Sequence, residues 1–281
     1  MPKVRLDVLL LEQGLAESRS KAQALIMAGQ VKVDGQVTLK PATAILPDAS
    51  LKVDPGPRFV SRGGEKLEAA LQAFGIDVHG WICADVGAST GGFTDCLLQH
   101  GAAKVYAIDV GKGQLDWKLR NDTRVVVMEE SNARFIESLP ERVDFVTMDA
   151  SFISLRKLLP VAKRWLSPLR LSPFSPKTGG EKEGGGSIVA LIKPQFEAGR
   201  AQVSRGGGVI RDPAVHRQVL LEVLNFASEE GFGLKGLLRS PLQGPKGNVE
   251  FLAWLAADPG GEPAESWVAR VLPEEQADEM S

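Results

Sequence analysis

A glycine-rich stretch is the strongest chemical signal in the chain; it runs from Asp85 to Asp95 and reads Asp-Val-Gly-Ala-Ser-Thr-Gly-Gly-Phe-Thr-Asp. An apolar run, 81–84, precedes it, and a helix-like segment that ends near residue 100 follows it. A buried strand, a glycine turn and a helix start in this order form a backbone pocket, because residues without a Cβ atom let a ligand approach the main chain closely. We therefore expect a nucleoside-like ligand at this turn.

A carboxylate at the end of the next strand-like run narrows the choice of ligand. Asp109 lies 18 residues after Gly91, where its side chain could accept hydrogen bonds from both hydroxyls of a ribose. The stretch lacks the Gly-x-Gly-x-x-Gly fingerprint and the Gly-Lys-Ser/Thr of a phosphate loop, and it resembles instead the S-adenosylmethionine (SAM) loop of class I methyltransferases. The predicted cofactor-binding residues are Asp85, Gly87, Ala88, Ser89, Thr90, Gly91, Gly92, Phe93 and Asp109. The alternative is a tight turn whose glycines serve only packing.

Four charged residues from separate segments form the second candidate group: Lys66, Asp149, Lys193 and Glu250. Three of them stand at or near the ends of predicted strands, in otherwise apolar surroundings. Burial of a charge is costly unless it is paired, so a cluster of two cations and two anions is more stable than four isolated burials. Taken one at a time, each residue is equally compatible with a solvated surface charge.

The elements that must position these residues alternate between strands and helices. The predicted strands cover residues 81–86, 104–109, 125–128, 143–149, 188–192, 234–240 and 248–255. The predicted helices cover 59–74, 91–99, a segment from Asn132, 155–166 and 213–230. This alternation predicts an α/β Rossmann-like domain with a mostly parallel seven-stranded sheet, whose site lies at the carboxyl ends of the strands.

The first 53 residues have a different pattern, with two short helices followed by a hairpin at Asp34-Gly35. Ser18 is the expected N-cap of the second helix, and Gly29 its end. This small α+β domain resembles the RNA-binding module named for ribosomal small-subunit protein four. The resemblance implies that four basic residues face RNA: Arg5, Arg19, Lys21 and Lys32. The alternative is a structural cap whose basic residues are merely solvated.

Five motifs, in order and spacing, are similar to those of the TlyA family (hemolysin A-like), which belongs to the FtsJ-type ribose 2'-O-methyltransferases. They are Ser61-Arg-Gly-Gly-Glu-Lys-Leu, the glycine-rich stretch, Met148-Asp-Ala-Ser-Phe-Ile-Ser-Leu, Leu191-Ile-Lys-Pro-Gln-Phe-Glu and Gly247-Asn-Val-Glu-Phe. The resemblance implies SAM as cofactor, cytidine ribose in ribosomal RNA as substrate, and a catalytic tetrad at Lys66, Asp149, Lys193 and Glu250. The expected domains are 1–54 (RNA binding), 55–60 (linker), 61–257 (methyltransferase) and 258–281 (flexible acidic tail).

The implied chemistry explains what each member of the tetrad would do. A ribose 2'-hydroxyl is a poor nucleophile until its proton is removed, whereas the sulfonium of SAM is already a good methyl donor, so the protein must align the reactants and remove a proton. Lys193 is the candidate base. The positive charges of Lys66 and of the sulfonium disfavour a charge on Lys193, whereas Asp149 favours one. Lys193 could therefore accept the proton either before methyl transfer or late, after transfer is under way. Glu250 is expected to hold Lys66 and the attacked ribose.

Composition sets further limits. With 33 Lys and Arg against 35 Asp and Glu, the net charge of −2 permits nucleic-acid binding without indicating it. No apolar run reaches membrane-spanning length and the chain begins without a signal-peptide core, so we expect a cytoplasmic protein with no membrane partner. We also expect a monomer. Two cysteines and three scattered histidines form no metal-ligand spacing, so no metal is expected. We assign no chemistry to the Pro- and Gly-rich stretch 171–187.

Two other functions compete with ribosomal RNA methylation. One is a non-catalytic ribosome-assembly factor whose second domain is only structural. The other is a membrane-active hemolysin, which the family's historical name suggests and no spanning or basic amphipathic segment supports.

Overall fold

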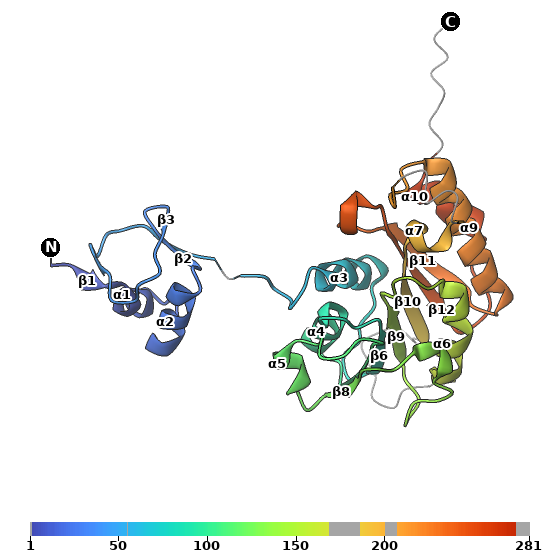
Figure 1. Cartoon of the computed structure of the whole chain (residues 1–281), viewed down its shortest axis with the longest axis horizontal. Helices are drawn as coiled ribbons and strands as arrows, with labels where there is room; N and C mark the ends of the chain where they lie inside the picture. The colour runs from blue at the N-terminus through green and yellow to red at the C-terminus, as the bar shows by residue number, and fades with distance from the viewer. Residues whose placement is uncertain (1, 55, 169–185, 200–206, 274–281) are drawn as a thin grey trace, which may run out of the picture. The chain divides into compact units, whose positions relative to one another are not determined.

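The computed structural model describes residues 2–54, 56–168, 186–199 and 207–273 (Figure 1). Contacts divide the chain into two compact units, Met1–Arg58 and Phe59–Ser281, which are described separately. Most of the stretch 171–187 and the last part of the expected tail lie outside the described residues.

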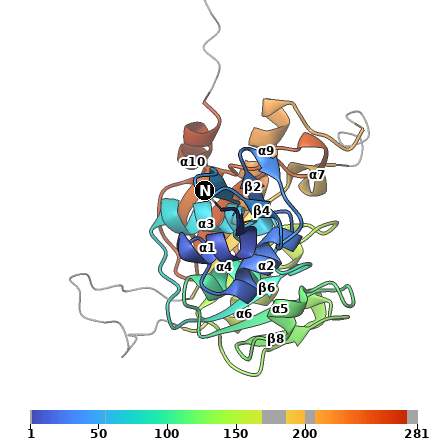
Figure 2. The same ribbon diagram turned by 90° about the vertical axis from the view of Figure 1, so that its left-hand side faces the viewer.

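The N-terminal unit packs two helices against short antiparallel strands (Figures 1 and 2). Its elements are β1 (Val4–Arg5), α1 (Leu6–Glu12), α2 (Arg19–Met27), β2 (Val31–Val33), β3 (Gln36–Val37), β4 (Ala44–Ile45) and β5 (Leu51–Val53). The Ser18 side chain caps α2 by accepting from the Lys21 amide, and Asp34 and Gly35 form the β2–β3 turn with positive φ angles of 50° and 84°. Both features were predicted. The β1–β4 pair was not, because strands of two residues show no alternation of apolar and polar residues.

A buried carboxylate joins the two helices of this unit. Asp7 has no exposed surface and accepts hydrogen bonds from Arg5 (2.9 and 3.0 Å), Arg19 (3.1 Å) and Gln23 (2.8 Å). The Arg5 hydrogen bonds, helped by Gln23 and Arg19, hold the pKa of Asp7 well below its usual range, although burial opposes them. The N-terminal unit should therefore depend on an ionised Asp7.

This dependence predicts an acid limit for the unit. Because the pKa of Asp7 is lowered by folding, its contribution is complete above the unfolded value of about 3.9 and is lost as the pH falls further. Asp7→Asn should weaken hydrogen-exchange protection of α1 and α2 at neutral pH and flatten its dependence on acid. Protection measured by mass spectrometry, corrected for intrinsic exchange, checks this, and parallel pH curves for the two proteins would contradict it.

The second unit is built on the predicted seven-stranded, mostly parallel sheet, in the order β11-β12-β10-β9-β6-β7-β8. Its strands are β6 (Ile82–Val86), β7 (Lys104–Ile108), β8 (Val125–Met128), β9 (Phe145–Met148), β10 (Ser187–Ile192), β11 (Gly233–Arg239) and β12 (Phe251–Ala256). Among these strands, β12 alone runs antiparallel to both of its neighbours. The start of β12 and the carboxyl ends of the parallel strands therefore lie at the same edge.

Helices cover both faces of this sheet. They are α3 (Gly63–Phe74), α4 (Gly92–Gln99), α5 (Trp117–Arg120), α6 (Leu159–Trp165), α7 (Pro194–Glu197), α9 (Pro213–Glu229) and α10 (Ala264–Val271). The first three pack into one apolar core, and α6, α9 and α10 pack into the other, on the opposite side of the sheet in Figure 1. Figure 2 shows β8 and α5 together at one end of the unit and α9 and α10 at the other.

Local signals explain the helix ends that were predicted. Gly75 takes the left-handed conformation (φ 66°) that ends α3, while Asp212 caps α9 through the Ala214 amide and Pro213 occupies its first turn.

Three predicted helices were wrong in extent. The helix expected over 59–74 begins only at Gly63. The helix expected from Asn132 is a single 3-10 turn, Ala133–Phe135, because Asn132 caps only that turn and residue 136 is already extended. The segment 155–166 is split into a 3-10 turn (Leu155–Lys157) and α6, because Pro160 has no amide hydrogen and fits only the first turn of a helix.

Candidate active site

Four of the segments that carry the predicted site residues meet at one edge of the sheet. The glycine-rich loop follows β6, Asp149 follows β9 and Lys193 follows β10. Glu250 immediately precedes β12, whose reversed direction brings it to the same edge. Lys66 reaches the site from α3.

Lys66 and Glu250 form a buried ion pair. The Lys66 Nζ atom lies 2.6 Å from Glu250 Oε2, and the side chains are 10% and 0% exposed. The Gln195 amide nitrogen lies 3.5 Å from the other carboxylate oxygen. A Cβ atom at Gly244 would lie 2.0 Å from that same oxygen, so a side chain there would displace the carboxylate. Glu250 is therefore held from several sides.

Lys193 and Asp149 form the second pair. The Lys193 Nζ atom lies 2.5 Å from Asp149 Oδ1 and donates to the Ser151 hydroxyl at 3.0 Å. The Lys193 side chain is 9% exposed and that of Asp149 is 23% exposed. The four charged residues thus form two ion pairs, and Gln195, which stands two residues after Lys193, contacts Glu250 of the other pair.

The glycines of the loop make close contacts with other parts of the protein. A Cβ atom at Gly87 (φ 84°) would lie 2.8 Å from the Asp149 carbonyl oxygen. At Gly91 (φ 97°) and Gly92 it would lie 2.2 Å from Leu119 and Ser61 side-chain atoms respectively. All three positions therefore serve protein packing, and Gly87 lets the loop approach the segment that carries Asp149.

Only two residues of this loop are exposed to solvent, and the rest are buried or half-buried. Ser89 and Thr90 are exposed, whereas Ala88 and Phe93 are buried. Asp85 is also fully buried, and its carboxylate accepts from the hydroxyls of Thr94 (2.8 Å) and Thr147 (3.0 Å). Burial raises the pKa of Asp85 to about 7, against the effect of these hydrogen bonds and with a smaller contribution from the charge of Asp149. The structure therefore places Asp85 where it supports the loop from below.

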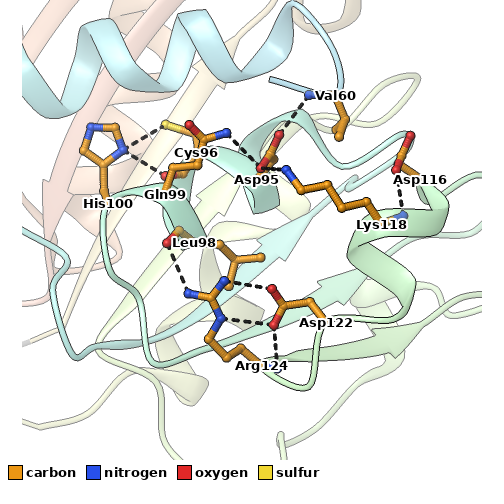
Figure 3. Close-up of polar contacts among 10 residues, drawn as sticks. All are labelled: Val60, Asp95, Cys96, Leu98, Gln99, His100, Asp116, Lys118, Asp122 and Arg124. Atoms are coloured by element: carbon orange, nitrogen blue, oxygen red, sulfur yellow. Dashed lines mark hydrogen bonds and ion pairs between the residues drawn. The ribbon is translucent and has the colours of Figure 1, made fainter. Parts of the chain in front are cut away.

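Asp95 joins the helix after the loop to its surroundings (Figure 3). Its carboxylate accepts from the Val60 amide at 2.9 Å and from the Gln99 side chain at 3.0 Å, and the Lys118 ammonium lies 3.7 Å away. The first residues of this unit and the start of α5 are thereby held against α4.

Asp109 fastens the exposed part of the loop. Its carboxylate accepts from the Ser89 amide at 2.8 Å and from the Gly111 amide at 2.7 Å. Each carboxylate oxygen has a further lone pair, so both can still accept a hydroxyl. The position fits the predicted role in ribose binding and adds a role in shaping the loop.

For Asp109→Ala we expect weaker SAM binding, by roughly 10- to 100-fold, because hydrogen bonds to a charged acceptor and the loop shape are lost together. Calorimetric titration with SAM measures the change. Asp122→Ala is the matched control, because Asp122 pairs with Arg124 and contacts no residue of the loop among its described partners. An unchanged affinity in Asp109→Ala would contradict the ribose assignment.

Sequence reasoning missed three neighbours of the tetrad: Ser151, Gln195 and Phe152. The Phe152 side chain is 90% exposed, its φ of 63° is unusual for a residue with a side chain, and its ring lies 4.9 Å from that of Phe196. Their only sequence signal was a position within the motifs that carry Asp149 and Lys193.

The four predicted RNA-binding residues all lie on the exposed surface of the N-terminal unit: Arg5, Arg19, Lys21 and Lys32. Arg5 and Arg19 also bond to Asp7, which fixes part of each guanidinium and leaves about half of each side chain exposed (45% and 53%). In the described part of the chain, no group of acidic, histidine or cysteine side chains could hold a metal ion. No helix in that part has the length and apolar character to cross a membrane.

Comparison with known proteins gives two family matches. The model of FtsJ-like methyltransferases matches residues 59–257, and that of the S4 domain matches residues 4–51. The chain is 47% identical over 257 residues to the 16S/23S rRNA (cytidine-2'-O)-methyltransferase TlyA of Mycobacterium tuberculosis, covering 90% of each. It is 44% identical to Hemolysin A of Brachyspira hyodysenteriae, over 89% of this chain and 98% of the other. A solved structure described as a candidate hemolysin from Streptococcus thermophilus is 43% identical, with a TM-score of 0.67 over 96% of each chain.

Proposed function

Because this chain belongs to the FtsJ-like methyltransferase family and, with its S4 domain, to the TlyA group, we propose that it methylates the 2'-oxygen of a cytidine ribose in ribosomal RNA. The observation that carries the proposal is the pair of lysine–carboxylate contacts beside the glycine-rich loop. A methyl transfer to a ribose hydroxyl needs a site that aligns the oxygen and removes one proton, and such a pair of contacts can do both.

The loop and Asp109 fit SAM as the cofactor. Ser89 and Thr90 expose hydroxyls on a turn whose backbone Asp109 holds, and the Asp109 carboxylate supplies acceptors for ribose hydroxyls. When bound, SAM supplies an activated methyl group on a positively charged sulfur. Asp85, which is buried beneath the loop, would position it rather than contact the cofactor.

Lys193 is the residue to which we assign the proton of the attacked hydroxyl. The Asp149 carboxylate, the Ser151 hydroxyl and, at 3.4 Å, the Asp149 carbonyl oxygen fix the position of its Nζ atom, and the ribose oxygen would take the place of this longest contact. The Lys193 amine would accept the proton of the hydroxyl that is methylated; a protonated amine would instead orient that hydroxyl, whose proton would then pass to water. Asp149 orients Lys193 and offsets the charge it gains.

Lys66 and Glu250 have a supporting role in this proposal. A buried ammonium at 2.6 Å from its carboxylate presents its other hydrogens in fixed directions. Lys66 can thereby donate to an oxygen of the acceptor ribose, while Glu250 keeps its Nζ atom in place.

Exposed groups in each unit offer contacts for the RNA. In the N-terminal unit, Arg5, Arg19, Lys21 and Lys32 provide the positive charge for phosphates. In the second unit, Phe59–Ser281, which we call the catalytic unit, the exposed ring of Phe152 provides an apolar face on which a base can stack. This ring contacts Phe196, and the Lys193 Nζ atom lies over the Phe196 ring. Unstacked nucleotides are the easiest to present to such a site.

The test is to incubate the protein with labelled SAM and either intact ribosomal subunits or free ribosomal RNA, and to map 2'-O-methylation by nucleotide. We expect label at a cytidine ribose. RNA binding without transfer would favour an assembly factor instead, and leakage from liposomes without transfer would favour a hemolysin. Either outcome would overturn the proposal.

A further inference from the structure

We propose that Glu197 is a positioning residue that locks the segment 149–155 against α7, and so sets the geometry of Asp149, Lys193 and Phe152. The proposal rests on the proposed function for its effect on methyl transfer. Its structural part, the locking itself, stands on contacts between the two segments.

The Glu197 carboxylate is buried where α7 contacts the segment 149–155. It is 8% exposed and is the last residue of α7, four residues after Lys193. One carboxylate oxygen accepts from the Ser154 hydroxyl at 2.6 Å, and the other accepts from the Leu155 backbone amide at 2.7 Å. Both oxygens are therefore committed to the segment that follows Asp149.

This burial is costly, which indicates that the contacts matter. Removal from water disfavours the charged form and raises the pKa of Glu197, although the Ser154 hydroxyl and the Leu155 amide oppose the shift. An apolar residue would avoid the cost altogether. A buried carboxylate is therefore expected here only if its two hydrogen bonds hold Ser154 and Leu155 in a position that the protein requires.

The same two segments are joined a second time at the proposed base. Lys193 bonds to Asp149 and Ser151 at one end of the segment, and Glu197 bonds to Ser154 and Leu155 at the other. Two attachments fix both the separation and the rotation of one segment on the other, whereas a single one would leave a pivot.

Phe152 lies between the two attachments, and its backbone shows why both are needed. A positive φ in a residue with a Cβ atom is strained and persists only where the surroundings enforce it. Its ring rests on Phe196, one residue before Glu197. With the Glu197 attachment removed, the segment could relax toward an ordinary φ, which would turn Phe152 and move Asp149 relative to Lys193.

The test compares Glu197→Ala with Glu197→Gln. Glutamine can still accept from the Leu155 amide and can donate to the Ser154 oxygen, so it keeps both hydrogen bonds without the charge. We expect Glu197→Ala to lower kcat by about 100-fold, since a displacement of about 1 Å has that effect, with SAM affinity unchanged. Glu197→Gln should restore kcat to within roughly threefold of wild type, because both hydrogen bonds are retained.

Glu141→Ala is the matched control. Glu141 also accepts two hydrogen bonds, from Lys104 (2.6 Å) and Tyr106 (2.8 Å), but it precedes β9 and so lies at the opposite edge of the sheet. Its loss should leave kcat unchanged. Equal losses of kcat and SAM affinity in Glu197→Ala, or a Glu197→Gln as inactive as Glu197→Ala, would overturn the positioning role.

Hydrogen exchange separates this inference from the proposed function. Amides of residues 150–155 should exchange faster in Glu197→Ala than in wild type or Glu197→Gln, whether or not the protein methylates RNA. If wild type transfers no methyl group, the proposed function fails while this measurement still decides the locking. Unchanged exchange in a folded Glu197→Ala would overturn the inference, and Ser154→Ala, which removes one attachment, provides a milder second variant if Glu197→Ala does not fold.

Discussion

Lys193→Ala should reduce methyl transfer by about 100- to 10,000-fold, the range expected when a general base is removed, and should leave SAM binding intact. The reason is geometric. Lys193 is held by Asp149 and Ser151 at the end of β10, whereas the loop that fits the cofactor follows β6 and does not depend on the lysine side chain for its hydrogen bonds. Transfer of labelled methyl under single-turnover conditions measures the first effect, and calorimetry measures the second.

Lys235→Ala is the control for a general effect of losing a lysine. Lys235 also pairs with an aspartate, Asp258 at 3.5 Å, but it lies in β11 with about a third of its side chain exposed. Its replacement should change neither quantity. If Lys193→Ala methylates at a rate near wild type, the assignment of the proton to Lys193 is wrong.

The second large effect is expected for Glu250→Gln. Removing one partner of a buried ion pair leaves the other charge uncompensated, which costs about 3–5 kcal/mol of the free energy of unfolding. Water has little access to the Lys66 ammonium, since the Lys66 side chain is 10% exposed and that of Glu250 is 0% exposed. Methyl transfer should also be lost, because Lys66 loses its fixed direction.

A double variant separates the charge from the shape. Lys66→Met combined with Glu250→Gln removes both charges and keeps the volume, so it should recover most of the stability and none of the activity. Urea unfolding followed by tryptophan fluorescence is suitable, because all 5 tryptophans of the chain lie in the catalytic unit. A loss below about 1 kcal/mol for Glu250→Gln would mean that the pair behaves like an exposed one.

The parts of the fold that could be predicted were those with local causes. The Asp34-Gly35 turn, the Ser18 cap and the Asp212-Pro213 helix start depend on a few adjacent residues, and the structure confirms each of them. The segment after Asn132 had a cap signal of the same kind, but a cap marks only the start of a helix. Its length depends on packing, which adjacent residues do not encode.

The candidate site divides in a similar way. The tetrad could be proposed because five motifs together resemble those of a known family, and the structure pairs its members as Lys66 with Glu250 and Lys193 with Asp149. Gln195 and Glu197 were missed because their partners are 55 and 43 residues away in the chain, and nothing in a polar side chain identifies a distant partner. The loop glycines were noticed for ligand access, while the protein atoms that they admit could be seen only in three dimensions.

The reversed direction of β12 makes the catalytic unit sensitive to the register of this strand. Glu250 pairs through its carbonyl oxygen with the Ser240 amide at 2.8 Å, and β12 begins one residue later. Successive residues of a strand point to opposite faces of its sheet. A shift of β12 by one residue would therefore present Val249 or Phe251 to Lys66, so the Lys66–Glu250 pair depends on the register of β12 as well as on the glycine at position 244.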